Sequence, residues 1–176
     1  MPQFHVSTLA RLMATIEVQA RCDIRAGFLY TQLCRYVQAY ARGHFETAAL
    51  YGRRMTEAFC MLALPEGHEA KEKGLCEQVW ALPFWYERVY AYIQDDPELV
   101  LIADEMGMSL TVSNVWWDLT VARRYGNDGA HVSDEQLYQQ PLAVQEETFV
   151  STVRIALATL VLLRKKPQGY LKGAKL

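Results

Sequence analysis

Apolar residues recur at intervals of three and four along most of the chain, and this spacing constrains the fold more than any other feature. Between residues 23 and 41, for example, Phe28, Leu29, Leu33 and Tyr36 follow it. Such a period gathers apolar side chains on one face of an α-helix. No alternating apolar run exceeds a few residues, and no hairpin turn separates two such runs. The sequence therefore predicts an all-α protein.

The same pattern predicts where the helices lie. The first helix follows Ser7, interpreted as its N-cap, and the remaining helices are expected over residues 23–41, 46–64, 70–81, 84–93, 97–105, 109–124 and 141–166. Prolines separate several of them, because proline suits a first helical turn and breaks a helix interior. Three or four long helices with short linkers, and extra short helices between them, predict an all-α bundle. We expect one domain over residues 1–168 and a flexible tail over 169–176.

Charge and cysteine spacing exclude several classes of protein. The formal net charge of the 176-residue chain is −2, so no overall positive field attracts nucleic acid, and phosphate binding would have to be local. The four cysteines form no CxxC pair, and the histidines are isolated, which argues against a metal site and a disulfide framework. We therefore expect free, buried thiols and neither a metal nor another cofactor.

Two apolar stretches bear on localisation. The apolar stretch near the N-terminus is interrupted by Arg11, Glu17 and Arg21, whereas a signal peptide has an unbroken apolar core. The run Ile155–Leu163 has no charge but is only about half as long as a bilayer requires. The sequence thus predicts a soluble, cytoplasmic protein without a membrane partner.

A turn rich in glycine and asparagine is the strongest candidate site. It runs from Arg124 to His131 and contains Gly126-Asn127 and Asp128-Gly129 between two predicted helices. Arginine is a permanent, forked cation, and histidine exchanges a proton near neutral pH, so the pair suits a phosphate or another anion. The same residues are also strong turn formers, and a simple helix-to-helix connection requires nothing more.

Aromatic residues form a second feature, concentrated between residues 80 and 92. Trp80, Trp85 and Tyr90 belong to this aromatic segment, which can fill the core or present a face to a partner or an RNA base. The adjacent Trp116 and Trp117 point about 100° apart on a helix and are expected in the core or an interface.

Residues 123–131, with the long apolar helix after them, resemble the signature R-x-x-G-N-x-x-x-H of the DUF4145 group in the HEPN superfamily. Residues 48–58, which include Arg53-Arg54 and Glu57, resemble the early helix of that group. The resemblance covers about a third of the chain. It implies an antiparallel four-helix bundle that commonly forms a homodimer.

In active HEPN proteins, an arginine and a histidine separated by four to six residues form a metal-independent endoribonuclease across the dimer, and six residues separate Arg124 from His131. The resemblance therefore implies that His131 acts as general base or acid at the RNA 2′-hydroxyl, while Arg124 stabilises charge on the phosphate. Asn127 and Arg123 are the expected substrate-binding residues. A toxin or defence effector of this kind would have RNA as its substrate and a defence-system or antitoxin protein as a possible partner.

Two other functions stay open. Tyr125 stands where active HEPN proteins place a small polar residue. The acidic pI of about 6.1 does not favour the binding of a polyanion such as RNA. The chain could therefore be a catalytically silent, HEPN-like module that dimerises or docks onto a defence or nucleic-acid-processing partner, with the aromatic segment as one contact. A helical small-molecule binder is the third possibility.

Overall fold

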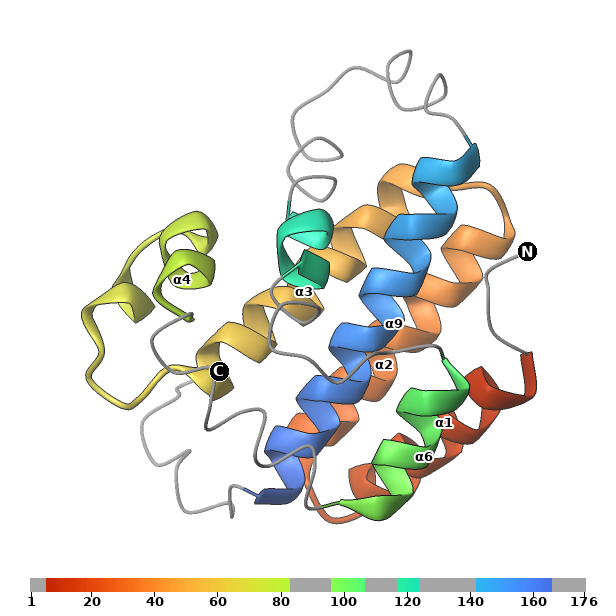
Figure 1. Cartoon of the computed structure of the whole chain (residues 1–176), viewed down its shortest axis with the longest axis horizontal. Coiled ribbons are helices and arrows are strands. Elements are labelled where there is room, and N and C mark those ends of the chain that lie inside the picture. The colour runs from red at the N-terminus through yellow and green to blue at the C-terminus, as the bar shows by residue number, and fades with distance from the viewer. Residues whose placement is uncertain (1–5, 83–95, 107–116, 124–141, 166–176) are drawn as a thin grey trace.

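The computed structural model describes residues 6–82, 96–106, 117–123 and 142–165, and all its regular elements in these ranges are helical. Figure 1 shows their arrangement. The elements are α1 (Val6–Ala20), α2 (Ile24–Ala41), α3 (Phe45–Ala63), the 3-10 helix η1 (Glu69–Glu72), α4 (Leu75–Ala81), α6 (Pro97–Glu105), a helical segment over residues 117–123, and α9 (Leu142–Lys165). The predicted all-α class is confirmed for this part of the chain.

Helix α9 lies at the centre of the described structure. It packs against both α2 and α3, while α1 packs on α2, and α6 contacts α1 and α9 (Figure 1). Every residue from Ile155 to Leu163 is buried, so this stretch contacts protein on all sides. A helix that is apolar all round is stable in water only when it is surrounded in this way. None of the described helices is long and apolar enough to cross a membrane.

Local signals fix the ends of the longer helices. The Asp23 carboxylate accepts a hydrogen bond from the Arg25 backbone N–H and caps α2, as Asp96 does for α6 through the Leu99 N–H. At the other end of α2, Gly43 takes a φ of 73°, a left-handed conformation that glycine adopts without steric cost. The predicted bounds of these helices are confirmed to within about a residue or two.

Two predicted helix bounds are wrong. Helix α1 already includes Val6 and Ser7, so Ser7 lies within the helix and is not its N-cap. The predicted helix over 70–81 is divided into η1 and α4. The Gln78 side chain donates hydrogen bonds to the carbonyl oxygens of Lys71 (3.4 Å) and Lys73 (2.9 Å), which stabilises this break by satisfying carbonyls near the end of η1. The predicted helix over 84–93 and the tail over 169–176 lie outside the described residues.

The three central helices meet closely at Gly52 of α3. A Cβ atom on Gly52 would lie 3.2 Å from Thr152 Oγ1 on α9 and 3.5 Å from a ring carbon of Tyr36 on α2. Thr152 and Tyr36 are both almost fully buried, and the Thr152 hydroxyl donates to the Thr148 carbonyl at 2.8 Å. The absence of a side chain at residue 52 therefore sets how closely α3 approaches its two neighbours.

Candidate functional site

Of the four predicted site residues, the structure describes only Arg123. Its Nη1 donates a hydrogen bond to the Cys76 sulfur of α4 at 3.3 Å, and its buried Nε has no hydrogen-bond partner in the described structure. The guanidinium is thus turned toward α4 at the end of the 117–123 segment. Arg124, Asn127 and His131 lie outside the described residues, as do Trp116 and most of the aromatic segment.

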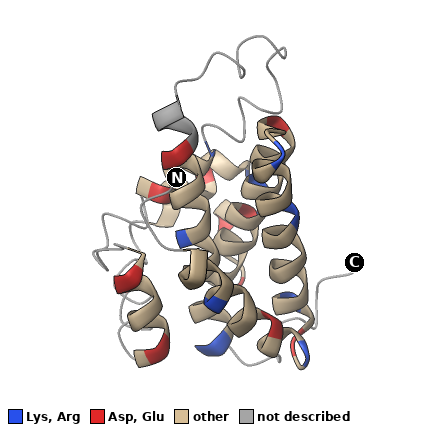
Figure 2. Cartoon of the chain, turned by 90° about the vertical axis from the view of Figure 1, so that its right-hand side faces the viewer, with Lys and Arg blue, Asp and Glu red and all other residues tan. Residues whose placement is uncertain are grey.

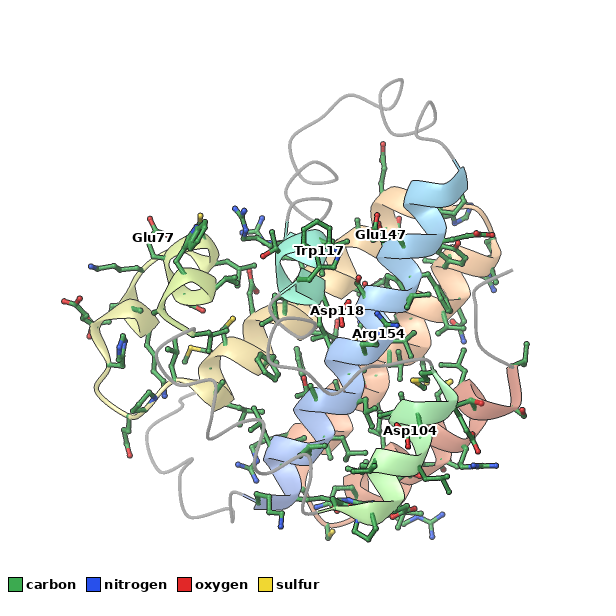
Figure 3. The ribbon with its side chains drawn as sticks, in the orientation of Figure 1. Glu77, Asp104, Trp117, Asp118, Glu147 and Arg154 are labelled. Carbon is green, nitrogen blue, oxygen red and sulfur yellow. The ribbon has the colours of Figure 1, made fainter. Side chains whose placement is uncertain are left out.

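The most distinctive polar cluster joins the 117–123 segment to α9. Asp118 is only 1% exposed, and its Oδ1 accepts a hydrogen bond from the Ser151 hydroxyl at 2.9 Å. The same oxygen lies 3.6 Å from Nη1 of Arg154, one helical turn further along α9. Figure 3 shows Asp118 and Arg154 side by side between the two elements. A buried carboxylate is thus held by one hydroxyl and one guanidinium.

Burial dominates the electrostatics of this cluster. It raises the pKa of the Asp118 carboxyl from 3.8 to about 7, because a low-dielectric surrounding disfavours the charged form. The positive charge of Arg154 and the hydrogen bond from Ser151 oppose this rise, and the negative charge of Glu147 adds to it. Oδ2 of Asp118 is buried and lacks a hydrogen-bond partner among the described residues. This unsatisfied oxygen is consistent with a carboxyl that holds its proton up to neutral pH.

A second contact fixes the 117–123 segment one residue earlier. The Trp117 indole N–H donates to the Glu147 carboxylate of α9 at 3.2 Å, and both side chains are labelled in Figure 3. The Trp117 side chain is 53% exposed, so it lies at the surface above the Asp118 cluster. The core alternative predicted for Trp117 is therefore excluded, and the alternative of an interface residue stays a prediction.

The cluster can anchor chain segments, but it does not face a substrate. Asp118 and Ser151 are buried, and the Arg154 side chain is 17% exposed, so none of the three presents a reactive group to a large ligand. Among the described residues, no group of three or more His, Cys, Asp or Glu side chains could hold a metal ion. The four cysteines are free, but only Cys60 is buried and Cys22 is exposed, which corrects the expectation that all are buried.

Sequence reasoning missed Asp118, Ser151 and Arg154, although a signal was present. Asp118 is the only acidic residue between positions 106 and 127, and Arg154 is the only charged residue between Glu147 and Arg164. A lone acid in one apolar helix and a lone base in another favour a buried pair, because a charge is rarely buried without a partner.

Comparisons of the chain with protein-family models, with curated proteins and with solved structures found no match.

Proposed function

We propose that this protein is a HEPN-like helical domain with metal-independent endoribonuclease activity, acting as a homodimer. The proposal begins from the Arg124–His131 motif, whose arginine and histidine have the required chemistry and spacing. The structural observation that supports it is the set of side-chain contacts that holds the 117–123 segment against α9. Arg124 directly follows this segment, and α9 begins eleven residues after His131.

These contacts supply the rigid support that a catalytic pair requires. Asp118 binds Ser151 and Arg154 inside the bundle, and Trp117 binds Glu147 at its surface. The described residues on the two sides of the motif are therefore fixed to each other. Catalytic groups lose efficiency when their geometry varies by more than a fraction of an ångström, so motif residues are expected to follow well-packed elements.

In the proposed reaction, His131 removes the proton from an RNA 2′-hydroxyl, and the 2′-oxygen attacks the adjacent phosphorus to form a 2′,3′-cyclic phosphate. The bond from phosphorus to the 5′-oxygen breaks, and the 5′-oxygen takes a proton from water. Arg124 stabilises the negative charge that develops on the phosphate oxygens. Asn127 donates to a phosphate oxygen. Arg123 contributes to phosphate binding through N–H groups other than the Nη1 group that donates to Cys76.

The test is an RNA-cleavage assay in EDTA with the wild type, His131→Ala and Arg124→Ala. We expect the wild type to cleave RNA despite chelation and each variant to lose about 100-fold or more of its activity. His44→Ala and Arg21→Ala are matched controls, because they remove the same side-chain types from exposed positions in the connections between described helices. Circular dichroism establishes that all five proteins fold. A folded wild-type dimer that leaves several RNAs intact would refute the nuclease proposal, as would equal losses in the controls.

A catalytically silent docking module is the second candidate, and one observation favours it. Trp80 is 57% exposed and Trp117 is 53% exposed. Trp80 lies in the last turn of α4 and is the first residue of the aromatic segment. Exposed tryptophans are typical of protein interfaces. Under this proposal the partner is a defence-system, antitoxin or nucleic-acid-processing protein, and light scattering with Trp80→Ser and Trp117→Ser would measure whether these residues hold a complex or a homodimer together.

A further inference from the structure

The antiparallel pair α2–α3 has an outer side that the other described helices leave open. We call it the hairpin face and define it by six exposed residues: Phe28 and Arg35 of α2, Arg42 at its C-cap, and Leu50, Arg54 and Met61 of α3. The α2 members are seven residues apart, and the α3 members are four and seven apart, so each set lies along one side of its helix.

A contact between α2 and α3 shows that these two sets of residues belong to the same surface. The guanidinium carbon of Arg35 lies 5.9 Å from the centre of the Tyr51 ring, a cation–π arrangement that links α2 to α3. Tyr51 precedes Arg54 by one helical turn and follows Leu50 directly. The antiparallel register set by this contact places Phe28 level with Ala58, about one helical turn from Met61.

The charges of the hairpin face have one sign. Residues 24–63 contain five arginines and two glutamates, a net charge of +3, whereas the whole chain has a net charge of −2 and the remainder therefore −5. Glu57 pairs with Arg53 at 3.0 Å, beside the face. Arg35, Arg42 and Arg54 have no carboxylate within ion-pair distance in the described structure, and the charged positions are coloured in Figure 2.

The apolar members of this face are large and well exposed. Phe28 is 45% exposed, Leu50 42% and Met61 47%. Arginine, methionine and aromatic residues are enriched at the centres of protein interfaces, while lysine, aspartate and glutamate are depleted, and the face has this composition. A surface that binds only phosphate has no need of exposed leucine and methionine.

We propose that the hairpin face binds an amphipathic, acidic helix of a partner protein. The apolar side chains of that helix contact Phe28, Leu50 and Met61, and its flanking carboxylates pair with the three arginines. A second copy of this chain fits less well, because it would bring two sets of arginines together. This binding is independent of the proposed nuclease activity, since it uses none of the residues assigned to RNA.

The probe is a synthetic helical peptide with leucine at heptad spacing and glutamate at the other positions. Its matched control peptide has lysine in place of every glutamate. Fluorescence anisotropy at low and high salt measures the affinity of the full chain for each. We expect the acidic peptide alone to bind, with an affinity that falls as salt is added, because the pairs lie at a solvent-exposed rim.

Two variants test the two parts of the face. The triple variant Arg35→Glu, Arg42→Glu, Arg54→Glu should weaken binding about tenfold or more by charge repulsion. The double variant Phe28→Gln, Met61→Gln should weaken it to a similar degree at high salt, where the apolar contacts remain. Lys73→Glu and Leu101→Gln change a basic and an apolar side chain at exposed positions outside α2 and α3, and should bind as the wild type does.

Several results would overturn the proposal. These are equal binding of the lysine peptide, equal weakening by Lys73→Glu or Leu101→Gln, or no binding of the acidic peptide by the folded wild type. Competition by a single-stranded RNA oligonucleotide that the triple variant no longer binds would instead assign the face to RNA. Self-association that the double variant abolishes would assign it to a second copy.

Discussion

Replacing Asp118 with asparagine should change how the stability of this protein depends on pH. The carboxyl is 1% exposed, and its pKa is raised to about 7, from an ordinary value of 3.8. Asparagine has nearly the same shape and can still accept the hydrogen bond from Ser151, but it does not titrate. The difference between the two proteins therefore isolates the proton of Asp118.

The direction and size follow from linkage. Between pH 4 and pH 7 the folded protein keeps the Asp118 proton, whereas the unfolded chain has lost it, so stability falls as the pH rises through this range. Each tenfold difference in proton affinity corresponds to about 1.4 kcal/mol, which gives a total of roughly 4 kcal/mol for the difference in pKa. The wild type should thus lose up to that much stability relative to Asp118→Asn between pH 4 and pH 8, and the difference should be constant below pH 4.

Urea unfolding, followed by far-ultraviolet circular dichroism at closely spaced pH values, measures this difference. Ser7→Ala, an exposed polar change on α1, should follow the pH profile of the wild type. Parallel profiles for Asp118→Asn and the wild type would show that folding leaves the pKa of Asp118 unchanged, and would also refute the reasoning. A wild type that gains stability relative to Asp118→Asn as pH rises would show that the attraction of Arg154 exceeds the effect of burial, and would refute the reasoning.

The remaining predictions concern packing and an ion pair between distant parts of the chain. Gly52→Val should cost about 1–3 kcal/mol by forcing α3 away from α9, whereas Gly27→Ala, where a Cβ meets nothing within 4 Å, should stabilise α2 by up to about 1 kcal/mol; chemical unfolding measures both. Phe59→Ala should cost about 3–5 kcal/mol in the same assay, because Phe59 is 1% exposed. Arg164→Gln should lower the melting temperature by a few degrees through loss of the 3.1 Å pair with Asp96, and high salt should reduce the difference between variant and wild type.

The positions of the long helices could be predicted because their signals are local. A three-and-four period, the Asp23 cap, the left-handed Gly43 and the Pro97 start each act within a turn or two of the residue concerned. The break between η1 and α4 could not be predicted in this way. It depends on the Gln78 amide reaching back to carbonyl groups five and seven residues earlier, a contact that exists only in the folded chain.

The candidate catalytic residues were predicted from a sequence motif. The described structure adds the position of the segment that directly precedes this motif. Asp118 and Arg154 are 36 residues apart in the sequence, and no local pattern specifies that they meet. The position of the segment before Arg124 follows from this buried contact, which the sequence indicated only as two isolated charges in apolar surroundings.

The sequence by itself determined that the described part of the chain is helical, because helix period, caps and breaks are properties of neighbouring residues. Only the tertiary structure decided that α9 is the central helix, that Gly52 sets the approach of α3, and that arginines far apart in the sequence share one open face. These features depend on which helix faces meet. That choice is made by the packing of the whole core, to which every helix contributes at once.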